Sequence, residues 1–405
     1  MKTGKTKLAA IGLILLWCDI ALANEWPSCG VAETFPAESW QLVGAAEHLW
    51  DATKLTTAKG LFESLDSAAV MVVYRGHLIA DWGDTNQKFT AQSIRKPLIS
   101  SLIGLEIENG DLRLDATLEE LDIDDTRPNL TEPERQATVR HLLLSRSGIY
   151  HPALYEVGRW KRVRASMQAQ KTEDGDDIFG PGDIWVYNNW DFNALGTIVE
   201  NVSGESVGQL FEEQIASRIH MQDFEAQDVA YTSKDSRTEQ HQQNWSEHRA
   251  YVFDISTRDL ARYGLLYLNC GQWEETPVVP ESWVLESTVG VDTRIGRPEE
   301  HRNTRFGDFA YLWQVDRDGS RRFTDLKTRQ PFYMGTGSRG HVLVVMPYLD
   351  LVIAHQVATT GGIGLEAQQR RGTEGSPSVE YEDIQRLITA ILVAHPQGDD
   401  ALVED

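Results

Sequence analysis

Cysteine is scarce in this sequence, with only Cys18, Cys29 and Cys270 in 405 residues. So few cysteines cannot form a dense disulfide framework, and a chain of this length can bury a sizeable hydrophobic core instead. The motifs Gly-x-Ser-x-Gly and His-Glu-x-x-His are both absent. Their absence argues against a nucleophile elbow of the α/β-hydrolase type and against a metalloprotease zinc site. We therefore expect no metal and no cofactor.

Basic residues are also few, since 38 Lys and Arg face 61 Asp and Glu, for a formal net charge of -23. An acidic chain of this kind is a poor partner for nucleic acid or for anionic lipid. We therefore expect a small molecule as the partner and no nucleic acid; the sequence leaves the oligomeric state open.

Long hydrophobic runs are missing apart from one near the start, Leu8 to Leu16, which is short for a membrane span. Lysines precede this run and Ala21-Leu22-Ala23 follows it, which is the order of a secretory signal peptide. We predict a signal peptide at 1–23, export to the periplasm or medium, and no stable membrane insertion after cleavage. A retained anchor is the weaker alternative. Cys29 and Cys270 could then pair in an oxidising compartment, although two separate thiols fit the sequence equally well.

Both ends of the chain predict strands of one antiparallel sheet. Ala68 to Tyr74 and His77 to Trp82 flank an Arg-Gly turn, and His341 to Met346 and Leu351 to His355 flank a second turn. Helical periodicity precedes the first pair, and a helix carrying Ile384, Leu387 and Ile391 on one face follows the second. The middle is dominated by helical patterns and has few convincing strands. These segments are Leu98 to Glu108, Ala137 to Leu144, Asn193 to Glu200, Val207 to Arg218 and Arg258 to Leu268.

The fold class that follows is α/β (α+β): an antiparallel sheet flanked by helices from both chain ends, with a mostly helical inserted domain. We place the α/β sandwich domain at 24–100 and 310–395 and the insert at 101–309. Residues 396–405 form an acidic tail.

Ser93-Ile94-Arg95-Lys96 is the only Ser-x-x-Lys tetrad in the sequence. It follows a predicted hairpin and precedes an apolar helix. Spacing of three residues brings Ser93 and Lys96 to the same helix face. A Lys that is shielded from water loses its proton more easily and can then accept the proton of a hydroxyl. A pair of this kind is usually two surface residues, and its context is what favours a nucleophile with its base.

Two further segments complete the pattern. Tyr187 can relay a proton to a leaving group, and Asn189 can hydrogen-bond Lys96 and a substrate carbonyl. A second Tyr-x-Asn, at Tyr267, stands at a predicted helix end and is interpreted as structural. Gly335-Thr336-Gly337-Ser338 precedes the strand at His341, and glycines let an edge strand admit a substrate backbone. The main-chain N–H groups of Ser93 and Ser338 are the expected oxyanion hole.

With these three motifs in this order, the chain resembles serine β-lactamases, penicillin-binding peptidases and related esterases, and is most similar to the class C-like branch. The resemblance spans roughly Ala68 to His355 and includes Thr138 to Gly148 and Ser256 to Gly264. It implies a β-lactamase/transpeptidase-like fold and a serine hydrolase that forms an acyl-enzyme on Ser93, with Lys96 and Tyr187 as its proton-transfer groups.

One position departs from the family pattern. The third motif usually begins with Lys, or sometimes His, where this chain has Gly335. A cation there recognises a substrate carboxylate, so its absence favours esters or small amides, as in the family VIII-type carboxylesterases and the 6-aminohexanoate-dimer hydrolases. Arg339 or His341 could substitute for the cation. The alternatives are a true β-lactamase or D-Ala-D-Ala peptidase, and a non-catalytic relative that binds cell-wall peptides.

Overall fold

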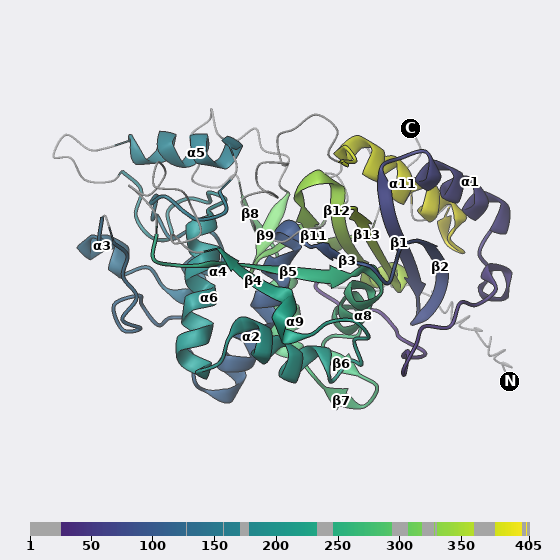
Figure 1. Cartoon of the computed structure of the whole chain (residues 1–405), viewed down its shortest axis with the longest axis horizontal. Coiled ribbons are helices and arrows are strands. Elements are labelled where there is room, and N and C mark those ends of the chain that lie inside the picture. Colours follow the sequence, from purple (N-terminus) through teal and green to yellow (C-terminus); the bar gives the residue numbers. More distant parts are fainter. Residues whose placement is uncertain are drawn as a thin grey trace, which may run out of the picture.

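A computed structural model describes residues 26–126, 128–156, 158–170, 178–232, 246–293, 307–317, 328, 330–359, 377–398 and 402 (Figure 1). The predicted signal peptide, 1–23, lies outside the described residues, and so does most of the predicted acidic tail. Within the described part of the chain, no helix has the length and apolar character needed to cross a membrane.

The largest sheet has eight antiparallel strands in the order β2-β1-β13-β12-β11-β10-β9-β8. It joins the two ends of the chain, because β1 pairs with β13 from Val70 opposite His355 to Tyr74 opposite Leu351. Both predicted hairpins are confirmed. The strands are β1 (Ser67–Tyr74), β2 (His77–Gly83), β8 (Val291–Asp292), β9 (Asp308–Ala310), β10 (Trp313–Asp316), β11 (Phe332–Gly337), β12 (His341–Met346) and β13 (Leu351–Val357).

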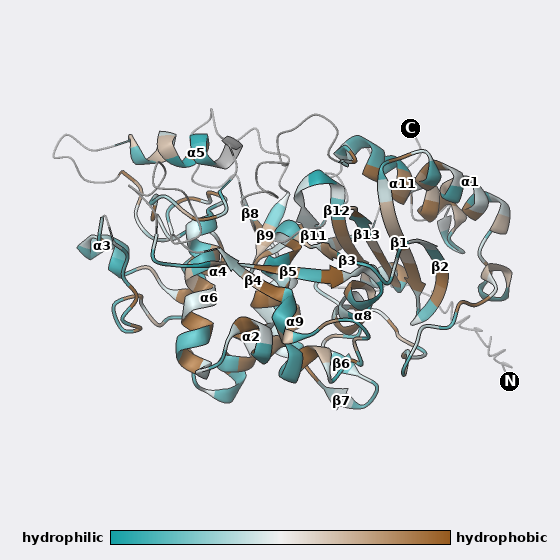
Figure 2. Cartoon of the chain, in the orientation of Figure 1, coloured by the Kyte–Doolittle hydropathy of each residue, from teal (hydrophilic) through white to brown (hydrophobic). Residues whose placement is uncertain are grey.

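Helices bury both faces of this sheet, which is why its strands read as continuous apolar runs (Figure 2). Because side chains alternate along a strand, Val70 and Val72 of β1 pack in the cluster that contains α1 (Ala52–Glu63) and α11 (Tyr381–Ala394). Met71 and Val73 point the other way, into the cluster that contains α8 (Thr257–Leu268). The predicted N-terminal and C-terminal helices are therefore confirmed, and they cover the same face.

A second sheet was not predicted. Its three strands have the order β3-β5-β4 and are β3 (Lys88–Thr90), β4 (Val229–Thr232) and β5 (Ala250–Ser256). The expectation of few strands in the middle of the chain was wrong here, because β5 is a buried strand rich in β-branched and aromatic residues. Two short strands of the main sheet, β8 and β9, also come from the range assigned to the insert.

The predicted helices of the middle are present with shifted ends. The helix predicted from Asn193 begins at Asn189, and the helix predicted over Val207 to Arg218 turns into a π-helix after Phe211. The helical elements of this region are α2 (Arg95–Asn109), α3 (Glu132–Arg135), α4 (Val139–Leu143), α5 (Gly158–Gln168), α6 (Asn189–Ser203), α7 (Val207–Phe211), η3 (Glu212–Ala216), η4 (Ala226–Asp228) and α9 (Glu281–Thr288). The remaining short elements are η1 (Ala45–His48), η2 (Gln92–Ile94), η8 (Ser338–Gly340), η9 (Pro347–Leu349), β6 (Gln272–Trp273) and β7 (Thr276–Pro277).

A disulfide joins Cys29 to Cys270, with Cα atoms 5.4 Å apart. It fastens the N-terminal segment to the end of α8. The backbone N–H of Gly30 donates to the carbonyl of Leu268 at 2.8 Å beside it, so two bonds of different kinds fix the segment at the same place.

Candidate active site

Ser93 lies in a tight 3-10 turn between the small sheet and the buried helix α2. The turn is tied to the sheet because the N–H of Ala91 donates to the carbonyl of Phe253 on β5 at 2.8 Å. Gln92, directly before Ser93, has a φ of 54°, a left-handed conformation that is unfavourable for a residue with a Cβ. The helix itself starts two residues after Ser93, at Arg95, so Ser93, the expected nucleophile, precedes the helix and does not belong to its first turn.

The hydroxyl of Ser93 is contacted by both predicted proton-transfer groups. Lys96 Nζ lies 2.7 Å from Ser93 Oγ, and Tyr187 Oη donates to the same oxygen at 3.0 Å. The Lys96 side chain is almost completely shielded, at 2% exposure, and its Nζ lies 4.8 to 4.9 Å from the ring centres of Phe192 and Tyr187. The three residues therefore form one hydrogen-bonded cluster.

The electrostatic environment of Lys96 favours the neutral amine. Burial lowers the pKa of Lys96 well below the usual 10.5, and the nearby charge of Arg95 lowers it further. A neutral amine at hydrogen-bonding distance from a hydroxyl is a competent proton acceptor.

Tyr187 is held in place by the turn that contains Ser145. Ser145 Oγ donates to the carbonyl of Val186 at 2.7 Å and accepts from the N–H of Asn188 at 3.1 Å, so one side chain fixes the backbone on both sides of Tyr187. Asn188 caps α6 by accepting from the N–H of Trp190. This geometry explains why the sequence signature Thr138 to Gly148 accompanies the Tyr-x-Asn motif.

Asn189 is buried at the first position of α6. Its expected hydrogen bond to Lys96 is not made, as no such bond occurs among the described residues. Asn189 is two residues after Tyr187 and begins α6. The hydrogen bonds that join Ser93, Lys96 and Tyr187 do not involve it.

The glycine segment forms the end of β11 and packs closely against the nucleophile turn. A Cβ at Gly337 would lie 2.8 Å from the carbonyl oxygen of Ala91 and 2.9 Å from Gln92 Cβ, and a Cβ at Gly335 would lie 3.1 Å from Pro97 Cγ. Only glycine allows this approach without displacement at Gly337. The strand therefore lies where a substrate bound at Ser93 would meet it.

The other two residues of that segment are held by polar contacts. Thr336 Oγ1 accepts from Gln314 Nε2 at 2.6 Å, which ties it to β10. Ser338 is the first residue after the strand, and its hydroxyl donates to Gln92 Oε1 at 3.1 Å. Gln92 also accepts from Tyr155 Oη at 2.7 Å. Its side chain thus links the nucleophile turn to the segment that carries the expected second oxyanion donor.

His341 does not supply the cation that the third motif lacks. It is fully buried at the start of β12, and burial, with His355 and Arg339 nearby, lowers its pKa to about 3. Its Nε2 lies 2.9 Å from Thr359 Oγ1. A neutral, buried His341 cannot attract a carboxylate at neutral pH. Arg339 donates to the carbonyl of Pro377 at 3.4 Å, at the turn between β11 and β12.

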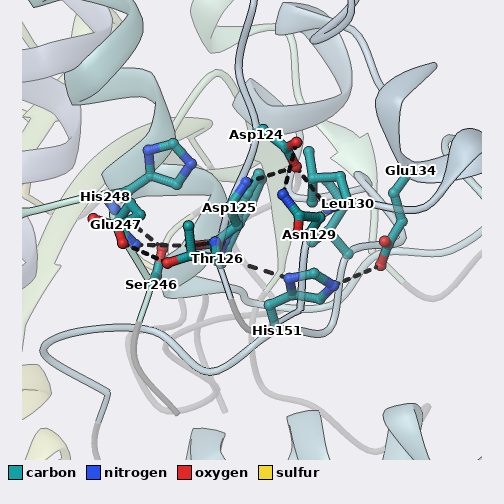
Figure 3. Close-up of polar contacts among 12 residues, drawn as sticks. Asp124, Asp125, Thr126, Asn129, Leu130, Glu134, His151, Ser246, Glu247 and His248 are labelled. Carbon is teal, nitrogen blue, oxygen red and sulfur yellow. Dashed lines mark hydrogen bonds and ion pairs between the residues drawn. The ribbon is translucent and has the colours of Figure 1, made fainter. Parts of the chain in front are cut away.

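A buried ionic cluster lies next to the helix that follows Tyr187 (Figure 3). His151 Nε2 lies 3.2 Å from Glu134 Oε1, and its Nδ1 lies 3.8 Å from Asp125 Oδ2. Asp125 accepts from Trp190 Nε1 at 2.6 Å and from the N–H of Glu247 at 2.8 Å. The cluster therefore connects the start of α6 to two distant loops. This cluster was not predicted from the sequence, because its members are far apart in the chain.

Sequence reasoning also missed Arg95 and Gln92, although both are next to predicted site residues. Arg95 stands inside the Ser-x-x-Lys tetrad and is fully buried. A signal was available for it, because a charged residue two positions after a nucleophile at the start of an apolar helix is unusual. In the described part of the chain, no group of three or more His, Cys, Asp or Glu is placed to hold a metal ion.

Fold and site together define a class. An antiparallel sheet built from both chain ends, with Ser93, Lys96 and Tyr187 gathered between it and a helical region, is a β-lactamase/transpeptidase-like fold. The family model described as Beta-lactamase matches residues 57–372. The chain belongs to this Beta-lactamase family, and the predicted family and fold class are confirmed. A search of curated proteins gives no match.

Solved structures with the same fold are distant in sequence. A protein described as a putative 6-aminohexanoate-dimer hydrolase from Bacillus anthracis has 16% identity and a TM-score of 0.58, over 93% of this chain and 91% of that one. EstCE1, a hydrolase with promiscuous acyltransferase activity, has 16% identity and a TM-score of 0.51, over 83% and 98%. The octameric penicillin-binding protein homologue from Pyrococcus abyssi has 15% identity and a TM-score of 0.53, over 85% and 77%. At such identities the similarity establishes the fold alone.

Proposed function

We propose that this protein is a serine hydrolase that cleaves an ester or a small amide through an acyl-enzyme on Ser93. The proposal rests on one observation: the amine of the buried Lys96 lies 2.7 Å from Ser93 Oγ, with Tyr187 Oη at 3.0 Å on the same oxygen. The membership of the Beta-lactamase family supports it.

The proposed reaction has two halves. Lys96 accepts the Ser93 proton as Oγ bonds to the substrate carbonyl carbon, and the negative charge on the carbonyl oxygen is stabilised by the N–H groups of Ser93 and Ser338. The bond to the leaving group then breaks. Tyr187 donates its phenolic proton to that group, and Lys96 passes the proton it took from Ser93 to Tyr187. Water attacks the acyl carbon in the second half, gives its proton to the same pair, and Ser93 Oγ leaves as the hydroxyl.

An ester or small amide is favoured over a carboxylate-bearing β-lactam because the cation that the family carries at the start of the third motif is missing. Gly335 replaces it, and the buried His341 is neutral. Two of the solved structures with a similar fold, described as a putative 6-aminohexanoate-dimer hydrolase and as the hydrolase EstCE1, are consistent with this preference.

A fluorophosphonate probe tests the reaction. We expect covalent labelling of the native protein, no labelling of Ser93→Ala, and unchanged labelling of Ser39→Ala, whose hydroxyl lies at the surface. Turnover of nitrophenyl butyrate without cleavage of nitrocefin or a D-Ala-D-Ala peptide supports an esterase. Cleavage of nitrocefin would favour a true β-lactamase, and absence of labelling would favour a non-catalytic peptide-binding relative.

Tyr187 has a matched control in the second Tyr-x-Asn segment. We expect Tyr187→Phe to lower kcat for nitrophenyl butyrate by about 10² to 10⁴-fold, the usual effect of losing a proton-transfer group. Tyr267→Phe removes a hydroxyl that lies 2.9 Å from Ser101 Oγ in the core, and should change stability without changing kcat. Equal kcat for the two variants would contradict the assigned role of Tyr187.

We also propose that the protein is exported. The Cys29–Cys270 disulfide supports this, because such bonds persist in oxidising compartments. The mass of the protein recovered from the periplasm or medium tests it, and the expected N-terminus is Asn24. A product that keeps residues 1–23 in the cytoplasm would contradict the proposal.

A further inference from the structure

Arg95 is a buried positive charge directly before Lys96 in the chain. Its side chain is completely shielded, and its Nη2 donates to Asn193 Oδ1 at 3.0 Å. The other guanidinium nitrogens, Nε and Nη1, have no hydrogen-bond partner among the residues that the structure describes. The guanidinium carbon instead lies over two aromatic rings, 4.5 Å from the centre of Tyr251 and 5.7 Å from that of Tyr155.

No carboxylate in the described part of the chain pairs with Arg95. The carboxyl groups of the elements packed around it are engaged elsewhere. They are Asp191 of α6, bonded to Ser147 and Asn188, Glu200 of α6, bonded to Tyr231 and Arg249, Asp254 of β5, bonded to Thr90, and Glu156, paired with Arg164. Burial raises the pKa of Asp191 well above its usual value, and its Oδ1 accepts hydrogen bonds from Ser147 and Asn188 and none from Arg95. The remaining titratable groups that face Arg95 and Lys96 are the phenols of Tyr155 and Tyr251, beside Arg95, and of Tyr187, beside Lys96.

A guanidinium stays charged in a protein, and an unpaired buried charge is unfavourable for folding. A buried charge without a partner therefore indicates a functional role that offsets its cost to stability. Resting on the proposed function, we infer that Arg95 is a positioning residue: its unpaired positive charge keeps the neighbouring amine of Lys96 neutral, ready to accept the Ser93 proton.

Two variants abolish the unpaired charge in different ways. Arg95→Met deletes it and keeps an unbranched side chain, while Asn193→Asp keeps Arg95 and places a carboxylate at the atom that already accepts its hydrogen bond. Both should raise the pKa at which Lys96 titrates by about one unit or more, since a like charge nearby disfavours the protonated amine. Arg262→Met is the matched control, because Arg262 is also fully buried but bonds to the carbonyls of Pro36 and Ile219. It should lower stability without moving the titration of Lys96.

The titration is read directly by NMR on protein carrying ¹³Cε-labelled lysine, with Lys96 assigned from Lys96→Met. A second readout is the pH dependence of the rate at which a fluorophosphonate labels Ser93, whose acid limb should move upward by the same amount in both variants. A Lys96 titration unchanged in Arg95→Met or in Asn193→Asp, in a variant that keeps its circular dichroism spectrum, overturns the inference. Failure of the wild-type protein to be labelled overturns the proposed hydrolase instead, and the NMR titration still decides the role of Arg95.

Discussion

His151 should make the stability of the protein depend on pH in the alkaline range. Its side chain is only 6% exposed and lies between Asp125 and Glu134 (Figure 3). Burial alone would lower its pKa, but the two carboxylates outweigh burial and raise the pKa from 6.5 to about 9. The folded state therefore binds the proton more tightly than the unfolded state does.

The size of the effect follows from linkage. A rise from 6.5 to about 9 corresponds to roughly 3 kcal/mol at 1.36 kcal/mol per pKa unit. Because the folded pKa is the higher one, this stabilisation is fully present below about pH 6.5 and is lost as the pH rises through about 9. His151→Gln, which cannot carry the charge, should be less stable than wild type by about 3 kcal/mol near pH 6, and the difference should shrink towards pH 10.

Urea unfolding followed by circular dichroism at pH 6, 7.5, 9 and 10 measures this difference. His395→Gln is the control of opposite sign, since burial lowers the pKa of His395 to about 4. The stabilisation by neutral His395 is lost as the pH falls from about 6.5 to about 4. The difference in unfolding free energy between wild type and His395→Gln should therefore be constant between pH 7.5 and 10. A difference between wild type and His151→Gln that stays constant from pH 6 to 10 would refute the charged state assigned to His151.

Two further variants test the packing of the site and the covalent link. Gly337→Ala should lower kcat for nitrophenyl butyrate at least 10²-fold, the size of a lost oxyanion donor, because its Cβ would meet the Ala91 carbonyl at 2.8 Å. Gly60→Ala, at a helix position with open space around it, should keep full activity, and equal activity in the two variants would contradict the close approach. Replacing Cys29 and Cys270 together by Ser should lower the free energy of unfolding by roughly 3 to 5 kcal/mol, since the bond spans 241 residues. Thermal melts with and without reductant measure this, and a wild-type melting temperature insensitive to reductant would contradict it.

The parts of the fold that could be predicted from the sequence are those fixed by local patterns. The runs at Ala68 to Tyr74 and at Leu351 to His355 are apolar, β-branched and bounded by turns, and they form β1 and β13. Their pairing with each other depends on contacts between chain ends, and only the repetition of the pattern suggested it. Strand β5 was missed because its neighbours β3 and β4 are very short and are separated from it in the chain.

The site divides in the same way. Ser93 and Lys96 are three residues apart, so their spacing placed them within reach of each other and their context marked them as a site; Tyr187 was recognisable from its motif and its order along the chain. The contacts that orient these groups join residues about 40 to 160 positions apart: Ser145 with Val186, and Ala91 with Phe253. Periodicity carries no information about such pairs, because they exist only once the helices and the two sheets have packed together.

In the proposed hydrolase, catalysis and recognition therefore depend on different parts of this site. The proposed reacting groups are fixed by buried contacts: the Ser93 turn by the small sheet, Tyr187 by the Ser145 turn, and Lys96 by the rings around it. Recognition of a carboxylate would need a cation at Gly335, where even a Cβ would lie 3.1 Å from Pro97. The same close packing that brings the strand to the nucleophile thus disfavours the side chain that a β-lactamase of the usual pattern uses. The proposed preference for an uncharged ester or amide thus follows from the packing of β11 against α2, and not from the chemistry of the Ser93 cluster.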